Sequence, residues 1–205
     1  MIKAIFFDYD GVLTTDKTGS LTTNRYLSRM ANVEYETVRN VFSEYNHDLL
    51  LGKITHREIW EAACEAMHRE IDFSLLEQAF LSTAANDPMF ALARRLKPNY
   101  ALGIITDNKK DRIDCLRKYQ ELDALFNPII VSAEFGSGKD SAAVFEYALR
   151  HVDTRPEECV FIDNNPDNLT VPKALGMGVI FHDDEKNDVG RLALSLTNEF
   201  LIRLD

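Results

Sequence analysis

The sequence predicts an α/β protein: a Rossmann-like, doubly wound parallel sheet with a block of helices inserted after its first strand. Five short apolar runs, rich in β-branched and aromatic residues, alternate with segments of helical periodicity. Such alternation is typical of an open sheet with right-handed crossovers. The runs are nearly continuous rather than alternately polar, as expected for parallel strands buried on both faces. The predicted strands are residues 2–7, 100–105, 129–131, 159–162 and 179–181.

The connection after the first strand is much longer than the others and contains no clear strand. Helical segments fill it, and the last of them leads directly into the second strand. We therefore expect residues 1–14 and 87–205 to form the α/β core, and residues 15–86 to form a separate helical insertion. The helices predicted in this connection are residues 24–31, 36–50, 56–70, 75–84 and 88–97.

Local capping signals support three of these helices. Thr55 with Glu58, and Ser74 with Glu77, fit the capping-box pattern, in which two side chains satisfy the free N–H groups of a helix start. Asp87-Pro88 opens the helix that precedes the second strand, where a proline is tolerated because its missing N–H has no helical partner. The starts of these helices are therefore predicted at these positions.

Helical segments also separate the later strands. Asn165 is suited to cap one of them, Pro166 to occupy its first position and Gly176 to end it. After the last strand, an apolar stripe at helical spacing predicts a final helix. The predicted helices are residues 111–122, 141–150 and 166–175, and the stripe consists of Val189, Leu192, Leu196 and Phe200.

Composition narrows the classes of function. The 205 residues carry a net charge of −10, which argues against binding to nucleic acid or to an anionic membrane surface, because both need a basic footprint. The sequence contains no run of 18 apolar residues, so no membrane-spanning helix is predicted. Cys64, Cys115 and Cys159 form no CxxC motif, which favours reduced thiols in a cytoplasmic protein. The oligomeric state is left open.

Acidic residues follow the first predicted strand, which ends in Asp8-Tyr9-Asp10-Gly11. Residues two apart in a strand point to the same side, so Asp8 and Asp10 are expected to lie on one side of the strand. Two like charges at that spacing repel, and each favours protonation of the other. The pair therefore predicts a compensating cation.

Polar clusters also follow the second and fourth strands, at Thr106-Asp107-Asn108 and at Asp163-Asn164. Ligands of open α/β sheets bind beyond the carboxyl ends of the strands, so the three clusters are expected to converge. Oxygen ligands without histidine or thiolate favour a hard cation, Mg²⁺. The alternative is that each cluster merely caps a turn, as Asp-Gly and Asn-Pro often do; three clusters at three strand ends favour a binding site.

Four motifs in order are similar to those of the haloacid dehalogenase superfamily of phosphatases. The similarity covers nearly the whole chain, and the helical insertion resembles the α-helical cap of the first subgroup of that family. The first motif, with its preceding strand, is the most specific. The motifs are Asp8-Tyr9-Asp10-Gly11-Val12-Leu13, then Thr106, Lys139, and Asp163-Asn164.

The resemblance implies a catalytic role for both aspartates of the first motif. Asp8 would be the nucleophile that forms an aspartyl-phosphate intermediate with the substrate phosphorus. Asp10 would protonate the leaving alcohol and then take a proton from the attacking water. Asp8, the backbone carbonyl of Asp10, and Asp163 would hold Mg²⁺.

The resemblance also implies a phosphate-binding set. Thr106 and the backbone N–H of Asp107 would hold phosphate oxygens, and Lys139 would neutralise the charge of the nucleophile and the phosphoryl group. Two positions depart from the family pattern. Asp140-Ser141 follows the lysine where Pro-Asp is frequent, and Asn164 stands where a second aspartate is common.

The leading interpretation is a Mg²⁺-dependent phosphomonoester hydrolase that acts on a small phosphorylated metabolite. The alternatives are a 2-haloacid dehalogenase, a phosphosugar mutase of the β-phosphoglucomutase kind, and a catalytically weak binding scaffold. The presence of Asp10 argues against the dehalogenase, because those enzymes lack the second aspartate. In the insertion, Lys53, His56 and Arg57 either reach the substrate or belong to a solvated helix start.

Overall fold

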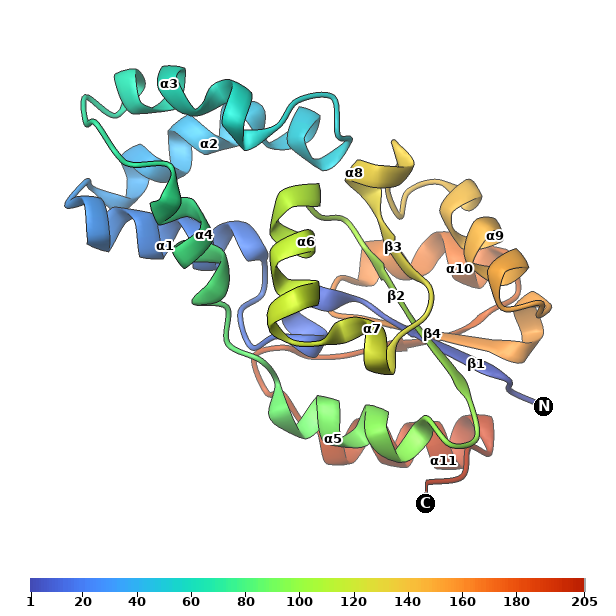
Figure 1. Ribbon diagram of the computed structural model, residues 1–205. Helices are drawn as coiled ribbons and strands as arrows, with labels where there is room; N and C mark the ends of the chain where they lie inside the picture. Colours follow the sequence, from blue (N-terminus) through green and yellow to red (C-terminus); the bar gives the residue numbers. More distant parts are fainter. Residues whose placement is uncertain (205) are drawn as a thin grey trace.

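The computed structural model describes residues 1–204, and their fold is the predicted Rossmann-like α/β arrangement. Its five strands form one parallel sheet in the order β3-β2-β1-β4-β5 (Figure 1). Because the first strand is central, its carboxyl end lies between those of β2 and β4. The strands are β1 (Ala4–Phe7), β2 (Ala101–Thr106), β3 (Ile129–Val131), β4 (Cys159–Asp163) and β5 (Gly178–Phe181).

The central strand is buried on both faces, which explains its continuous apolar sequence. Ile5 and Phe7 pack into the apolar cluster on one face of the sheet, and Phe6 packs into the cluster on the other. In the register, Phe7 lies level with Ile104 of β2 and with Ile162 of β4. The residues that follow these three therefore emerge at one edge of the sheet.

Helices cover both faces, as a doubly wound sheet requires. The apolar residues of α5, α6 and α11 belong to one cluster and those of α9 to the other, and α5 and α11 lie together beneath the sheet in Figure 1. Two short helices, α7 (Leu122–Leu125) and α8 (Ser132–Phe135), were not expected. The larger helices are α5 (Asp87–Leu96), α6 (Lys110–Tyr119), α9 (Ala142–His151) and α11 (Val189–Phe200).

The prediction of one continuous helix at residues 166–175 is wrong. Asn165 caps the segment as expected, since its side chain accepts a hydrogen bond from the backbone of Asp167 at 3.1 Å. A 3-10 turn, Pro166–Leu169, comes first and α10 (Thr170–Ala174) follows it. Pro172 accounts for the break, because it has no N–H to donate to the carbonyl four residues earlier.

Four helices between residues 19 and 81 pack around an apolar cluster of their own, which includes Leu27, Phe42 and Trp60. We call them the four-helix unit; in Figure 1 it lies to one side of the sheet, beside α6. Two chain segments join it to the sheet, and Thr14 and Ala85 pair across them. The division into domains at residues 14 and 87 stays a prediction. The helices are α1 (Gly19–Ala31), α2 (Tyr35–Leu50), α3 (His56–Ala66) and α4 (Ser74–Leu81).

The first of these helices begins at Gly19, five residues before the predicted start at 24. Its first turn consists of glycine, serine, leucine and threonine, which have mostly weak helix propensity. The side chain of Thr18 accepts a hydrogen bond from the backbone N–H of Leu21 at 3.2 Å. This N-cap stabilises the extra turn.

One of the two predicted capping boxes is present. Thr55 and Glu58 form it reciprocally at the start of α3. The box at Ser74 and Glu77 is wrong, because Ser74 is already the first residue of α4, and the side chain of Asp72 accepts its backbone N–H at 2.8 Å. An Asx turn therefore replaces the box.

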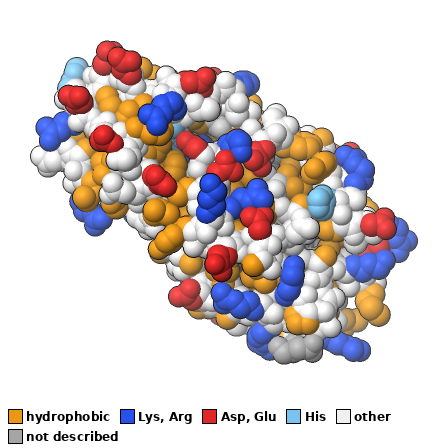
Figure 2. Space-filling model, viewed as in Figure 1, with side chains coloured by type: hydrophobic (Ala, Val, Ile, Leu, Met, Phe, Trp, Pro, Cys, Tyr) orange, Lys and Arg blue, Asp and Glu red, His pale blue; other side chains and the backbone are white. Residues whose placement is uncertain are grey.

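The surface carries both signs of charge. On the face seen in Figure 2, Asp and Glu side chains are interspersed with Lys and Arg side chains over the whole length of the molecule. Among the described residues, no helix is long and apolar enough to cross a membrane.

Candidate active site

The first motif does not continue the strand, so the expectation that Asp8 and Asp10 lie on one side of a strand is wrong, although both residues line one cavity. The strand ends at Phe7, and the chain then turns with Gly11 at φ +73°. A side chain at Gly11 would be strained by this φ, and its Cβ would lie 2.1 Å from the amide nitrogen of Asn164. The turn therefore gives each aspartate its own surroundings.

Asp8 is compensated by a lysine from a distant part of the chain. The ammonium of Lys139 lies 2.9 Å from Oδ2 of Asp8 and 2.7 Å from Oδ2 of Asp163, so it bridges the two carboxylates. Asp8 is 6% exposed, Lys139 is 2% exposed and Asp163 is fully buried. Oδ1 of Asp8 accepts the backbone N–H of Tyr9 at 2.7 Å. The predicted compensating cation is thus supplied, at this residue, by the protein itself.

Burial and neighbouring charges shift the pKa values of this cluster in opposite directions. Burial raises the pKa of Asp8 to about 7, although the ammonium of Lys139 acts to lower it. Burial acts to lower the pKa of Lys139, but the charges of Asp8, Asp163 and Asp107 outweigh it, so that pKa is raised. Lys139 is therefore a permanent cation in this site.

The second motif lies beside this pair, as the register of the sheet requires. Thr106 ends β2 and is buried, and Oδ1 of Asp107 accepts the backbone N–H of Lys139 at 3.0 Å. Burial also raises the pKa of Asp107. The predicted catalytic and phosphate-binding residues line one cavity of about 540 Å³, namely Asp8, Asp10, Thr106, Asp107 and Lys139.

Asp163 is fully buried and is not among the residues that line the cavity. Besides Lys139, it accepts the backbone N–H of Asn165 at 2.7 Å and the amide of Asn168 at 3.1 and 3.2 Å. Asn164 does line the cavity, and its amide donates to the carbonyl of Lys17 at 3.4 Å. The fourth motif therefore contributes one buried carboxylate and one amide to the site.

The donor set fits Mg²⁺ by its chemistry. Asp8, Asp163 and the carbonyl of Asp10 offer hard oxygen atoms, without a histidine or thiolate that would favour a softer metal. Within residues 1–204, no group of three His, Cys, Asp or Glu side chains is arranged to hold a metal ion. Mg²⁺ needs no such group, because it takes one or two carboxylates and keeps several waters.

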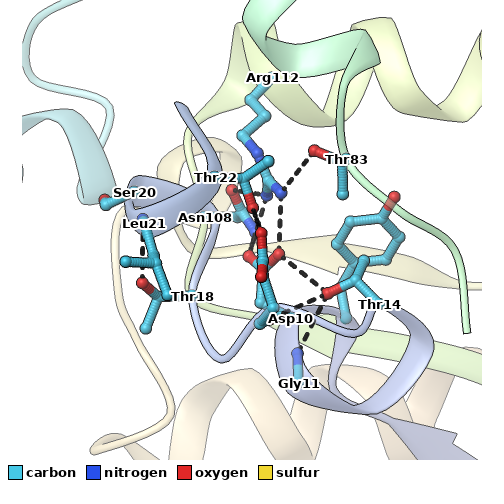
Figure 3. Close-up of polar contacts among 12 residues, drawn as sticks. Asp10, Gly11, Thr14, Thr18, Ser20, Leu21, Thr22, Thr83, Asn108 and Arg112 are labelled. Carbon is cyan, nitrogen blue, oxygen red and sulfur yellow. Dashed lines mark hydrogen bonds and ion pairs between the residues drawn. The ribbon is translucent and has the colours of Figure 1, made fainter. Parts of the chain in front are cut away.

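Sequence reasoning missed the partner of Asp10, which is Arg112 of α6. The guanidinium binds both carboxylate oxygens, at 2.8 and 2.9 Å, and Asn108 donates to Oδ2 at 2.7 Å (Figure 3). The available signal was weak: Arg112 precedes buried Leu116 by one helical turn, which places a basic residue on the apolar face of α6.

The four-helix unit supplies the opposite wall of the cavity. That wall is mainly polar. The three residues considered at the sequence level do not line it: Lys53 pairs with Asp48 on the surface, Arg57 stacks on a phenylalanine, and buried His56 pairs with Asp111 of α6 at 2.8 Å. The polar residues of the unit that do line it include Ser20, Asn24, Arg39, Ser43 and Asn46, and Lys17, just before the unit, lines the cavity beside them.

Comparisons with known proteins agree with this fold. A family model described as haloacid dehalogenase-like hydrolase matches residues 2–176. The chain is 26% identical over 200 residues to glyceraldehyde 3-phosphate phosphatase of Pyrococcus furiosus, and the match covers 88% of this chain and 80% of that protein. It is 28% identical over 209 residues to drimenol cyclase drtB of Aspergillus calidoustus; this match covers 98% of the chain but only 37% of that longer protein.

Among solved structures, the chain is similar to a haloacid dehalogenase family enzyme of Bacteroides thetaiotaomicron, determined in complex with magnesium and inorganic phosphate. The TM-score is 0.75 at 18% identity, and the match covers 90% of this chain and 96% of that one. At this level of identity the likeness establishes the fold.

Proposed function

Because the chain belongs to the haloacid dehalogenase-like hydrolase family, we propose that it is a Mg²⁺-dependent phosphomonoester hydrolase that acts on a small phosphorylated metabolite. The observation that carries the proposal is the cavity in which Asp8, Asp10, Thr106 and Lys139 meet. A 26% identical relative that is named a phosphatase, and most of whose length the match covers, supports the proposal, as does a structural neighbour determined with magnesium and phosphate.

In this mechanism the two aspartates divide the chemistry. A carboxylate oxygen of Asp8 attacks phosphorus, the bond from phosphorus to the alcohol oxygen breaks, and Asp10 gives its proton to that oxygen. Water then attacks the aspartyl-phosphate and loses a proton to Asp10, which releases inorganic phosphate and restores Asp8. Mg²⁺, when bound by Asp8, Asp163 and the carbonyl of Asp10, supplies neutralising charge to the phosphoryl oxygens.

The remaining residues bind and neutralise. The ammonium of Lys139, already 2.9 Å from Asp8, allows a dianionic phosphate to approach an anionic nucleophile. Thr106 and the backbone N–H of Asp107 hold phosphate oxygens. These donors are fixed by the sheet before substrate arrives, so little reorganisation is needed during the reaction.

We further propose that residues 15–86 form the cap of this enzyme. The four-helix unit lines the cavity with hydroxyl, amide and cationic groups, which suit a small substrate with hydroxyl groups and a second polar end. Covering the cavity would exclude water other than the attacking molecule. The cap is therefore expected to determine the choice of substrate.

The direct test is phosphate release from p-nitrophenyl phosphate and a panel of phosphorylated metabolites, with Mg²⁺ and with EDTA. Release that requires Mg²⁺ supports the proposal. Folded protein that releases no phosphate from any of them would refute it. The same panel should include a phosphosugar assayed for isomeric products and a 2-haloacid assayed for halide, because these report the mutase and dehalogenase alternatives.

Lys109 is expected to make substrate binding depend on pH. Its ammonium donates to Oγ of Ser20 at 2.7 Å and lines the cavity. Burial, and then the charge of Arg112, lower the pKa of Lys109 to about 8. The positive charge is present below that pH and is lost as the pH rises through it, so KM for an anionic substrate should rise above about pH 8. The rise in KM should vanish in Lys109→Met. It should persist in Lys110→Met, which removes an exposed neighbouring lysine. A rise that is unchanged in Lys109→Met would show that Lys109 is not the group that titrates.

Replacing Asp163 by asparagine is expected to weaken Mg²⁺ binding. The change removes one of the two carboxylates of the donor set while keeping the shape of a fully buried side chain. The Mg²⁺ concentration for half-maximal activity should rise about tenfold or more. Calorimetric titration of the protein with Mg²⁺ would show the same weakening without any substrate. Asp167→Asn changes an exposed residue of the same loop and should leave both measurements unaltered; an equal effect of the two variants would count against Asp163 as a ligand.

A further inference from the structure

Arg112 is one of the most deeply buried charged side chains at the site. It is 1% exposed, and its guanidinium donates through Nη2 to Oδ1 of Asp10 at 2.8 Å and through Nη1 to Oδ2 at 2.9 Å. Two parallel bonds of this kind fix orientation as well as charge. The carboxylate of Asp10 is therefore held in one plane by the planar fork of the guanidinium.

The two oxygens of Asp10 are not equivalent in this arrangement. Oδ2 accepts two short hydrogen bonds, from Arg112 and from the amide of Asn108 at 2.7 Å. A carboxylate oxygen has two lone pairs, so Oδ2 is fully occupied. Oδ1 accepts one short bond from Arg112, and the hydroxyl of Thr14 lies at 3.5 Å, too far for a strong second one (Figure 3). A proton can therefore be carried on Oδ1 without displacing a short bond.

Three segments of the chain hold the guanidinium in place. Arg112 comes from α6, its Nη2 donates to the hydroxyl of Thr83 in the segment that leads back from the four-helix unit, at 3.3 Å, and Gly19 at the start of α1 faces it. A Cβ on Gly19 would lie 2.3 Å from Cζ of Arg112, so the absence of a side chain there makes room for the guanidinium. Nε of Arg112 is buried without a hydrogen-bond partner, so the contacts of the side chain are made through Nη1 and Nη2.

We propose that Arg112 is a positioning residue that directs proton transfer by Asp10 to a single oxygen, Oδ1. The proposal rests on the proposed phosphatase function. In the first half-reaction the Asp8–phosphorus bond forms, the bond from phosphorus to the alcohol oxygen breaks, and the proton on Oδ1 moves to that oxygen. In the second, the attacking water returns a proton to Oδ1 as its oxygen bonds to phosphorus and the bond to Asp8 breaks. Arg112 exchanges no proton; it holds Asp10 so that Oδ1, which accepts only one short bond, keeps a lone pair open for the proton.

The test compares kcat/KM for an alkyl phosphate and for p-nitrophenyl phosphate. The value of kcat/KM reports the first half-reaction. In that step an alkoxide leaving group needs a proton, whereas p-nitrophenolate leaves without one. In Arg112→Met, kcat/KM for the alkyl substrate should fall by about 100-fold, in line with the usual contribution of a general acid. For p-nitrophenyl phosphate it should fall far less. Arg112→Lys keeps the charge but not the paired bonds, and the same selective loss, smaller in size, is expected.

Two further variants separate positioning from mere structure. Gly19→Ala leaves Asp10 and Arg112 unchanged but displaces the guanidinium from the side of α1, so it should reproduce the selective loss even if Arg112→Met does not fold. Arg117→Met removes a partly exposed arginine of the same helix, paired with Asp123, and should change neither value.

The outcomes separate the two levels of the proposal. Equal losses on both substrates in Arg112→Lys and Gly19→Ala, with folded protein, would overturn the positioning role and leave the phosphatase function standing. Wild-type protein that hydrolyses neither substrate would overturn both. A selective loss on the alkyl phosphate, absent in Arg117→Met, supports the assignment of Arg112.

Discussion

Phosphate release is expected to fall by about 10⁴-fold or more when Asp8 is replaced by asparagine, which is the scale seen when a covalent nucleophile is removed. Asparagine keeps the size of the side chain and can still accept the backbone N–H of Tyr9. It has no carboxylate to attack phosphorus, so no aspartyl-phosphate can form. The measurement is initial rate over a substrate panel with saturating Mg²⁺. Mass spectrometry of acid-quenched samples should detect one added phosphoryl group on the wild type and none on the variant.

The matched control for this variant is Asp140→Asn. Asp140 lies at the same edge of the sheet, one residue after Lys139, but is exposed, and it carries no role in the proposed reaction. Its rate should stay near that of the wild type. A rate for Asp8→Asn within tenfold of the wild type would show that Asp8 is not the nucleophile, whatever the Mg²⁺ requirement.

The parts of the fold that could be predicted are those that burial dictates. A strand such as β1 that is covered on both faces must be apolar along its whole length, so its sequence reveals it. The errors lie where one local contact decides the outcome. Thr18 adds a turn to α1 by capping it, Asp72 replaces an expected capping box, and Pro172 interrupts the helix expected at 166–175.

The candidate site shows the same division. Parallel strands must end at one edge, so Asp8, Thr106 and Asp163 could be brought together on paper. The turn at Gly11 could not be predicted, so the argument that placed Asp8 and Asp10 on one side of a strand failed. Nor could the pairing of Asp10 with Arg112, because these residues are 102 positions apart and no spacing rule connects them. The two carboxylates do need compensating charge, as the sequence suggested. Lys139 supplies it to Asp8, and Arg112 supplies it to Asp10.

Lys139 compensates the charge of Asp8. Replacing Lys139 by methionine is therefore expected to lower both activity and stability. Removing one member of a buried ion cluster leaves its partners charged without compensation, which costs about 3–5 kcal/mol of unfolding free energy. Phosphate release should fall by about 10²–10³-fold, as for the loss of one preorganised group that stabilises the transition state. The measurements are urea denaturation and initial rates. Lys186→Met removes an exposed lysine paired with Asp183 and should cost less than about 0.5 kcal/mol.

The pH dependence of that stability loss is the sharper test of the role of Lys139. In the wild type, burial already raises the pKa of Asp8 to about 7 against the lowering influence of Lys139, so without the lysine this pKa should rise further. A carboxyl group whose pKa is higher in the folded than in the unfolded chain binds more protons when folded, and stability then falls as the pH rises between the two values. The difference in unfolding free energy between wild type and Lys139→Met should therefore be larger at pH 8 than at pH 5, where protonated Asp8 needs no counter-ion. An equal difference at both pH values would mean that Lys139 stabilises the fold by packing, because the contribution of a counter-ion should shrink once Asp8 is neutral.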